Sequence, residues 1–211
     1  MKFQLALDGS LSDSLMVLKQ THTYVDIVEV GTPLVHREGI HAVQRILKAY
    51  PNLSILADFK IMDAGEYEAT IAFEAGCDYV TILGMAYDVT VRSAVKAARH
   101  YGKTLVADMI GVSDIMERSK ALLDMGVQVL CFHSAYDLRF TQRMPSETLK
   151  EMRAQLGKDV PLSIAGGIKL ENIDEVLPYQ PDFIVVGSGI TQADDPGQAA
   201  RNLSIRIRDA T

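Results

Sequence analysis

The chain has 211 residues, of which 48% are hydrophobic, and a formal net charge of −6. This composition excludes disorder, and no apolar run approaches the ~20 residues that span a bilayer, so we expect one compact, soluble, cytoplasmic domain over residues 1–211 with no membrane partner. The acidic charge argues against nucleic acid as a partner, although a few backbone N–H groups can still bind one small phosphate.

Eight short apolar runs recur along the chain, and amphipathic segments with helical periodicity lie between them. The runs are FQLALD (3–8), VDIVEVG (25–31), LSILADFK (53–60), YVTILG (79–84), TLVADMIG (104–111), VQVLCFH (127–133), VPLSIAGG (160–167) and DFIVVGSG (182–189). Val, Ile and Leu dominate them, which is typical of parallel strands covered on both faces. Helical segments such as EYEATIAFEAG and IMERSKALLDMG end in glycine directly before the next run.

The repeated strand–helix unit predicts a single-domain (β/α)₈ barrel, the TIM barrel, in the α/β class. The junctions EAGCDYV (74–80) and DMGVQVL (124–130) share the order helix end, glycine, strand. A doubly wound sheet is the alternative, and it usually carries a GxGxxG fingerprint after its first strand. Here the first run ends in Asp8-Gly9-Ser10 with no such fingerprint, so we favour the barrel.

Ionisable side chains stand at the carboxyl ends of most predicted strands, where such barrels place their active sites. In chain order they are Asp8, Glu29, Asp58 with Lys60, Asp108 and His133. A single carboxylate there can be a helix N-cap, and Asp8 fits that interpretation best because Gly9 and Ser10 follow it. Together these residues indicate a site, because unpaired buried charges would cost roughly several kcal/mol.

The third predicted strand contributes two of these charges. Side-chain alternation places Leu56, Asp58 and Lys60 on one face, so Asp58 and Lys60 should point together into the barrel mouth. Asp63 lies three residues further on, past the strand. It either caps the helix that starts near Gly65 or reaches across to another subunit.

A hard divalent cation suits these carboxylates, because Mg²⁺ takes one or two of them and keeps positions for water and substrate oxygens. Glu29 and Asp58 are the candidate ligands. His133 has no His or Cys partner at a zinc spacing, and it is either a base that moves a proton on a substrate carbon or a buried, merely hydrogen-bonded histidine. Cys77 and Cys131 match no metal or redox spacing, so we expect reduced, buried thiols.

Two glycine clusters follow the last two predicted strands directly. They are Gly166-Gly167 and Gly187-Ser188-Gly189. The loops after strands 7 and 8 are the recurrent phosphate site of these barrels, because glycine lets backbone N–H groups approach phosphate oxygens closely. We therefore expect these five residues to bind the phosphate of a small substrate.

The segment DFKIMDAGEYEA (58–69), with its Asp-x-Lys-x-x-Asp core, resembles the signature of the orotidine-phosphate decarboxylase superfamily. The longer context, with FEAGCDYVTILG (73–84), looks like the 3-hexulose-6-phosphate synthase branch. The similarity runs along nearly the whole chain, through QLALD (4–8), EVGTPL (29–34), AGGI (165–168) and DPGQAARN (195–202).

The resemblance implies a reversible, Mg²⁺-dependent aldol addition of formaldehyde to ribulose 5-phosphate through a metal-stabilised enediolate. By motif, Glu29 and Asp58 would hold the metal, Lys60 would stabilise the developing oxyanion, and His133 would take the C1 proton. A Schiff base at Lys60 is the less favoured route, because the nearby carboxylates favour the charged amine.

The resemblance also implies a homodimer in which Asp63 serves the neighbouring subunit's site. Asp8 and Asp108 would line the substrate, and the glycine loops would hold its phosphate. A non-catalytic sugar-phosphate-binding protein is one alternative function, which the complete set of charged residues disfavours.

The 3-keto-gulonate-6-phosphate decarboxylase branch is the nearest alternative. It carries arginine where this chain has Tyr136, threonine where it has Ala165, and glutamate where it has Asp108. These departures favour the synthase, although the synthase pattern does not account for Tyr136 either. Arg139 and Arg143 lie further along the same loop and leave a decarboxylase side activity open.

Overall fold

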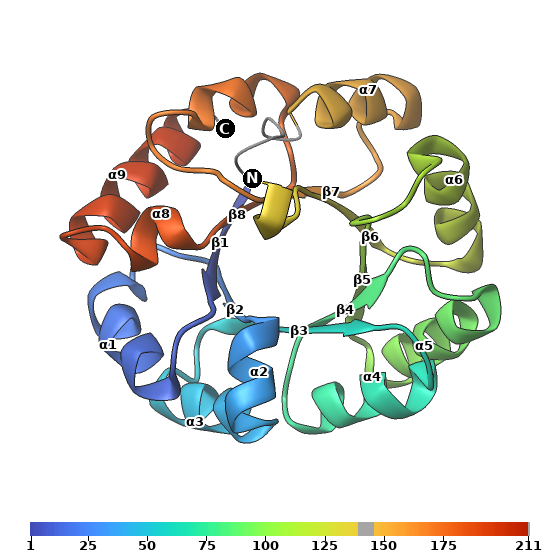
Figure 1. The fold of residues 1–211 in the computed structure, drawn as a ribbon, viewed down its shortest axis with the longest axis horizontal. Coiled ribbons are helices and arrows are strands. Elements are labelled where there is room, and N and C mark those ends of the chain that lie inside the picture. Colours follow the sequence, from blue (N-terminus) through green and yellow to red (C-terminus); the bar gives the residue numbers. More distant parts are fainter. Residues whose placement is uncertain (139–145, 211) are drawn as a thin grey trace.

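A computed structural model describes residues 1–138 and 146–210 of the chain. Within these residues, eight parallel strands close into a barrel in sequence order, which confirms the predicted TIM barrel (Figure 1). The strands are β1 (Lys2–Leu7), β2 (Ile27–Val30), β3 (Ser54–Ile61), β4 (Tyr79–Leu83), β5 (Thr104–Asp108), β6 (Val129–His133), β7 (Leu162–Ala165) and β8 (Phe183–Val186).

An outer ring of helices surrounds the strands (Figure 1). The helices are α1 (Leu11–Thr21), α2 (Thr32–Glu38), α3 (His41–Ala49), α4 (Gly65–Glu74), α5 (Asp88–Tyr101), α6 (Ile115–Met125), α7 (Ser146–Leu156), α8 (Ser188–Thr191) and α9 (Pro196–Asp209). Three short 3₁₀ helices are η1 (Tyr136–Leu138), η2 (Ile173–Glu175) and η3 (Leu177–Tyr179). In the described segment between β7 and β8, η2 and η3 take the place of a regular α-helix, and Pro178 removes one backbone donor there.

The glycine junctions noted in the sequence end helices as expected. Gly76 and Gly126 have φ values of 101° and 98°, a left-handed conformation that glycine adopts without steric cost. The amide of Gly126 bonds to the carbonyl of Leu123 at 2.9 Å, and that of Val127 bonds to the carbonyl of Leu122 at 3.0 Å. These bonds turn the chain from α6 back towards the next strand.

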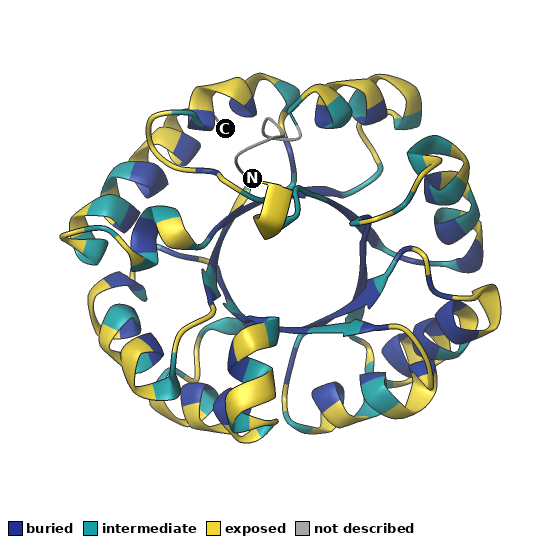
Figure 2. Ribbon diagram, in the orientation of Figure 1, coloured by how far each residue is buried: buried dark blue, intermediate teal, exposed yellow. Residues whose placement is uncertain are grey.

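The strands are largely buried (Figure 2), and side-chain alternation divides their residues between two cores. Outward-facing residues such as Leu5 and Ile55 pack against the helices, whereas Ile27, Leu56 and Val106 fill the barrel interior. Burying such a side chain stabilises the fold by about 1.5–3 kcal/mol. Below the carboxyl ends of the strands the interior is mostly apolar, and the charged side chains lie at those ends.

The amino end of the barrel is closed by aromatic packing. The rings of Tyr79 and Phe183 meet edge to face with centroids 5.9 Å apart, and the Lys2 ammonium lies over both of them. Cys77 and Cys131 are free, buried thiols, as predicted, and burial raises the pKa of Cys77 to about 12. Among the described residues, none of the helices combines the length and apolar character that a membrane span requires.

Candidate active site

Strand β3 departs from regular geometry where its two charged residues lie. Ala57 pairs with Val80 of β4 and Ile61 pairs with Ile82, so three residues of β3 lie opposite one residue of β4. Within this bulge Lys60 has a φ of 49°, which is uncommon for a residue other than glycine. The regular alternation expected through Lys60 is therefore broken, yet its Nζ lies 2.6 Å from Asp58 Oδ2, and the predicted association of the two charges is confirmed.

Asp58 is a buried carboxylate, 5% exposed, with hydrogen bonds to both oxygens. The hydroxyl of Thr81 donates to Oδ1 at 2.8 Å, and that of Thr32 lies 2.7 Å from Oδ2 and 2.8 Å from the Asp58 carbonyl. Lys60 donates to Oδ2 as well. A carboxylate offers about four acceptor positions, so at least one position on Oδ1 is left for another ligand.

Glu29 lies on β2 in the same polar layer. Gln4 donates from Nε2 to its Oε2 at 2.6 Å, and no lysine or arginine among the described residues forms an ion pair with it. Burial raises the pKa of Glu29 to about 8, and the nearby charge of Asp58 adds to the shift. Two carboxylates with too little positive charge around them are suited to bind a cation.

Asp108 connects Lys60 and His133 at the ends of β5 and β6. Its Oδ2 lies 3.1 Å from Lys60 Nζ and 3.0 Å from His133 Nδ1, while Oδ1 accepts from the amide of Ile110 at 3.0 Å. Burial alone would raise the pKa of Asp108, but the hydrogen bond to His133 and the neighbouring Lys60 ammonium hold it below its usual value. Burial favours a lower pKa for Lys60, but Asp58 and Asp108 together raise it.

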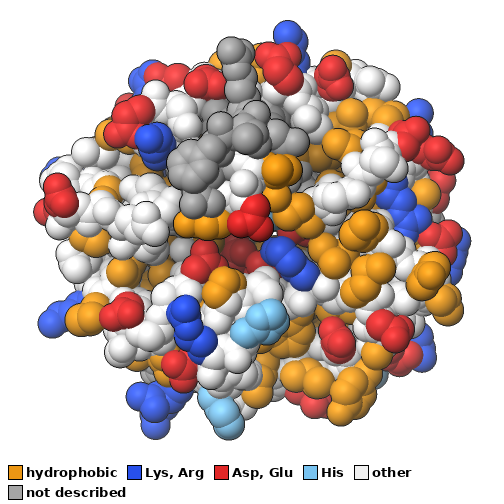
Figure 3. Space-filling model, in the orientation of Figure 1, with side chains coloured by type: hydrophobic (Ala, Val, Ile, Leu, Met, Phe, Trp, Pro, Cys, Tyr) orange, Lys and Arg blue, Asp and Glu red, His pale blue; other side chains and the backbone are white. Residues whose placement is uncertain are grey.

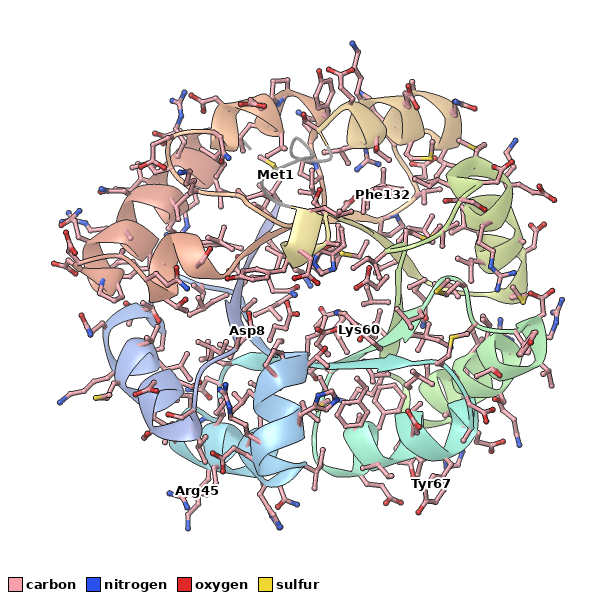
Figure 4. All side chains as sticks on the ribbon, in the orientation of Figure 1. Met1, Asp8, Arg45, Lys60, Tyr67 and Phe132 are labelled. Atoms are coloured by element: carbon pink, nitrogen blue, oxygen red, sulfur yellow. The ribbon has the colours of Figure 1, made fainter. Side chains whose placement is uncertain are left out.

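Asp8 does not cap the following helix, so the N-cap interpretation is wrong. Ser10 is the N-cap residue of α1 and accepts the amide of Asp13 at 3.2 Å, because its shorter side chain stands directly before the first turn. Asp8 instead stands across the barrel mouth from Lys60 (Figure 4). Although it is exposed at the rim, partial burial raises its pKa, and the charge of Asp58 adds to this.

Figure 3 shows the resulting face of the molecule, where acidic and basic side chains gather over the centre of the barrel. The structure therefore brings together all six ionisable residues predicted at the strand ends: Asp8, Glu29, Asp58, Lys60, Asp108 and His133. They combine an ammonium group, a histidine and several carboxylates, a set that can move a proton and stabilise developing negative charge.

Asp63 lies outside this cluster, on an exposed turn. Ala64, not Asp63, is the N-cap residue of α4, and Asp63 Oδ1 accepts the amide of Ala64 at 2.7 Å. Asp63 also lines a surface pocket of about 340 Å³ together with Tyr67 and Val89. Within the part of the chain that the structure describes, no ion pair or side-chain hydrogen bond joins Asp63 to the charged cluster.

The two glycine loops pack against each other beside the mouth. Gly166 and Gly167 have φ values of 97° and 72°, and a Cβ at Gly166 would lie 2.9 Å from that of Ser134. A Cβ at Gly189 would lie 2.8 Å from the carbonyl of Ile168, and one at Gly187 would lie 3.9 Å from Asp8 Oδ2. The loops thus border the charged cluster. Side chains at Gly166, Gly167 or Gly189 would crowd or strain the loops, whereas a Cβ at Gly187 would make only ordinary van der Waals contacts.

Tyr136 is exposed in η1, the short yellow helix at the upper edge of the barrel opening in Figure 1. Arg139 and Arg143, considered above for a decarboxylase side activity, lie outside the described residues.

The donor set at Glu29 and Asp58 fits Mg²⁺. Both are oxygen ligands, and Mg²⁺ typically takes one or two carboxylates and completes its shell with water and substrate. Among the described residues, no group of three or more His, Cys, Asp or Glu side chains forms a metal site of the all-protein type. A bound cation would also counter the charge that raises the pKa of Glu29.

Sequence reasoning missed three neutral side chains that hold the carboxylates: Gln4, Thr32 and Thr81. Gln4 and Thr81 each interrupt an apolar strand, in FQLAL and YVTIL, and this interruption was the available signal. A polar residue on the inward face of a buried strand needs a partner, which here is the charged cluster.

Comparison with known proteins adds a family match over almost the full chain. The model of the orotidine 5'-phosphate decarboxylase / HUMPS family matches residues 1–203. A 3-hexulose-6-phosphate synthase of Bacillus subtilis (strain 168) is 42% identical over 204 residues, which cover 96% of this chain and 97% of that protein. One of Staphylococcus haemolyticus (strain JCSC1435) is 41% identical over 211 residues, covering 100% of this chain and 98% of the other.

Solved structures agree with this match. The crystal structure of 3-hexulose-6-phosphate synthase from Salmonella typhimurium is 38% identical, covers 100% of both chains and has a TM-score of 0.96. That of 3-keto-L-gulonate-6-phosphate decarboxylase from Vibrio cholerae O1 biovar El Tor is 28% identical, covers 100% of this chain and 98% of the other, and has a TM-score of 0.87.

Proposed function

Because the chain belongs to the orotidine 5'-phosphate decarboxylase / HUMPS family, we propose that it is an aldehyde-lyase that reversibly condenses formaldehyde with ribulose 5-phosphate to 3-hexulose 6-phosphate. One observation carries the proposal: Asp108 joins the base His133 to the cation Lys60 beside the carboxylate pair Glu29 and Asp58. Deprotonation next to a carbonyl needs a base and positive charge in this arrangement.

The reaction begins with removal of a C1 proton by His133. Because Asp108 is an acceptor at Nδ1, that nitrogen carries the imidazole proton and Nε2 is the base. The electron pair of the broken C–H bond forms an enediolate. Its C1 carbon then attacks the carbonyl carbon of formaldehyde, and the protonated imidazole returns the proton to the new alkoxide.

Lys60 stabilises the oxyanion in this scheme. Its raised pKa keeps the amine protonated, which suits a hydrogen-bond donor and disfavours a Schiff base. Mg²⁺, held by Glu29 and Asp58, would supply further positive charge where the enediolate oxygens become negative. Asp8 lines the substrate, and the loops with Gly166, Gly167, Gly187, Ser188 and Gly189 hold its phosphate.

A homodimer completes the proposal. Tyr67, Tyr87 and Val89 are 71%, 77% and 75% exposed. Tyr67 lies on α4, Tyr87 is the N-cap residue of α5 and Val89 lies in its first turn, and Tyr67 and Val89 line one surface pocket with Asp63. Figure 3 shows hydrophobic side chains over this region, and such patches mark interaction surfaces. A second copy covers the patch, and its Asp63 enters the neighbouring site.

We place the activity in the cytoplasm, where a phosphorylated pentose is found and where free thiols such as Cys77 and Cys131 stay reduced.

The test is an assay with ribulose 5-phosphate, formaldehyde and Mg²⁺, with and without a chelator. We expect formaldehyde consumption that stops when the metal is removed. Release of carbon dioxide from 3-keto-gulonate 6-phosphate without formaldehyde consumption would identify a decarboxylase. Chelator-insensitive turnover with borohydride trapping at Lys60 would overturn the metal mechanism, and no reaction with either substrate would indicate a non-catalytic binding protein.

A further inference from the structure

Thr81 occupies the place opposite the bulge in β3. It is the one residue of β4 between Val80 and Ile82, and three residues of β3 face it. Its side chain is buried, with the residue 5% exposed. A buried hydroxyl at this point can replace the backbone hydrogen bonds that the bulge disrupts.

The Thr81 hydroxyl makes two hydrogen bonds of opposite polarity. The backbone N–H of Lys60 donates to Thr81 Oγ1 at 2.9 Å, and Oγ1 donates to Asp58 Oδ1 at 2.8 Å. An amide can only donate and a carboxylate can only accept, so the direction of both bonds is determined. One side chain therefore holds the carboxylate of Asp58 and the backbone of Lys60 at the same time.

Local sequence alone fixes neither the backbone conformation of Lys60 nor the rotation of the Asp58 carboxylate, and the two Thr81 bonds restrict both. Lys60 has a left-handed φ of 49°, which needs support from its surroundings. Thr32 and Lys60 contact Oδ2 of Asp58, whereas Thr81 contacts Oδ1, so Thr81 limits rotation of the carboxylate.

We propose that Thr81 is a positioning residue, which sets the Asp58 carboxylate for metal binding and the Lys60 ammonium for oxyanion stabilisation. The inference rests on the proposed function and adds to it a residue that acts through Asp58 and Lys60. Loss of a supporting hydrogen bond of this kind typically costs 10- to 100-fold, roughly, in metal affinity or activity.

The experiment compares Thr81→Val, which keeps the side-chain shape but removes the hydroxyl, with Thr81→Ser, which keeps the hydroxyl. Thr21→Val is the matched control, because Thr21 is also buried and its hydroxyl donates to the carbonyl of Val17 in its own helix, away from the charged cluster. Three quantities are measured: kcat and KM, the Mn²⁺ dissociation constant from electron paramagnetic resonance, and hydrogen exchange of the Lys60 amide.

For Thr81→Val we expect a kcat about 10- to 100-fold lower with a smaller change in KM, and Mn²⁺ binding about 10-fold weaker. Exchange of the Lys60 amide should be about 10-fold faster. Thr81→Ser should keep kcat, the Mn²⁺ affinity and the exchange rate of the Lys60 amide close to those of the parent. Unchanged amide exchange in Thr81→Val would overturn the proposed support of Lys60, and faster exchange with unchanged kcat and Mn²⁺ affinity would overturn the positioning role.

The exchange and Mn²⁺ measurements need no substrate, so they separate this inference from the proposed function. If the parent protein binds Mn²⁺ but does not consume formaldehyde, the proposed function fails while the effect of Thr81 on Asp58 is still measured. If the parent binds no Mn²⁺, the positioning of a metal ligand is overturned directly.

Discussion

Nδ1 of His133 lies 3.0 Å from Oδ2 of the buried Asp108, and this contact determines which imidazole nitrogen can act as a base. Because the pKa of Asp108 is held below its usual value, the carboxylate remains an acceptor near neutral pH. The same oxygen lies 3.1 Å from Lys60 Nζ. One carboxylate thus orients the proposed base and holds the proposed oxyanion donor.

Replacing Asp108 with asparagine tests this arrangement. The amide cannot balance the charge of Lys60, and it accepts the His133 proton more weakly, so we expect kcat to fall about 10²- to 10⁴-fold. The change is measured by steady-state kinetics, with circular dichroism to verify folding. Asp159→Asn, at an exposed loop position, is the control and should keep its activity. A kcat within about threefold of the parent for Asp108→Asn would contradict the role of Asp108.

The raised pKa of Glu29 predicts that the stability of the metal-free protein depends on pH. Its pKa is raised from 4.5 to about 8 by folding, so the folded state binds this proton more tightly than the unfolded state. This contribution to stability is fully present below about pH 4.5 and is lost as pH rises through about 8. We expect the contribution of Glu29 to the free energy of unfolding to fall by about 2–4 kcal/mol over that pH range.

Thermal unfolding in a chelating buffer from pH 5 to pH 9 provides the measurement. Glu29→Gln should have a flatter profile than the parent, whereas exposed Glu171→Gln should follow the parent. Adding Mg²⁺ should raise the parent's Tm more at pH 8 than at pH 6, because the metal binds the ionised carboxylate. Parallel profiles for the parent and Glu29→Gln would show that Glu29 does not titrate in this range.

The shared site of the proposed homodimer can be tested by mixing two inactive variants. In a hybrid dimer one subunit carries Lys60→Ala and the other carries Asp63→Ala. If Asp63 acts across the interface, both substitutions affect the same one of the two sites. A hybrid dimer then has one site with both defects and one intact site. Equal mixing should therefore restore about a quarter of the parent activity.

The control mixture is Lys60→Ala with Asp108→Asn. Lys60 and Asp108 form an ion pair within one subunit, so no hybrid site is intact and no activity should return. Recovery in both mixtures would indicate contamination with parent protein, and recovery in neither would show that Asp63 does not serve the neighbouring site.

The strand-end residues were predictable because all strands of a parallel barrel end on the same face. Short runs rich in Val, Ile and Leu locate the strands, and their carboxyl ends bring distant residues such as Asp8 and His133 to one face. Sequence alone could not predict the bulge at Lys60, since no glycine or asparagine marks its left-handed backbone. At the bulge the Lys60 amide donates to Thr81 of the next strand, a tertiary contact that no local pattern records.

The same limit applies to Asp8, whose N-cap interpretation was wrong, and to Asp63, whose direction the sequence left open. Asp8 and Ser10 are both good N-cap residues, and only the position where α1 begins decides between them. The direction of Asp63 depends on contacts beyond its own turn, which no local pattern records.

The proposed phosphate site can be tested by adding charge at Ser188, the exposed first residue of α8. Ser188→Asp places a carboxylate beside the glycine loops, where it would repel phosphate. We expect KM for ribulose 5-phosphate to rise at least about 10-fold with little change in kcat, because phosphate binding is equal in the ground and transition states. Ser188→Asn is the neutral control, and Ser113→Asp adds the same charge after β5 on the same face. Equal KM increases for Ser188→Asp and Ser113→Asp would indicate general repulsion over the barrel mouth, and an unchanged KM for Ser188→Asp would rule out phosphate binding at this loop.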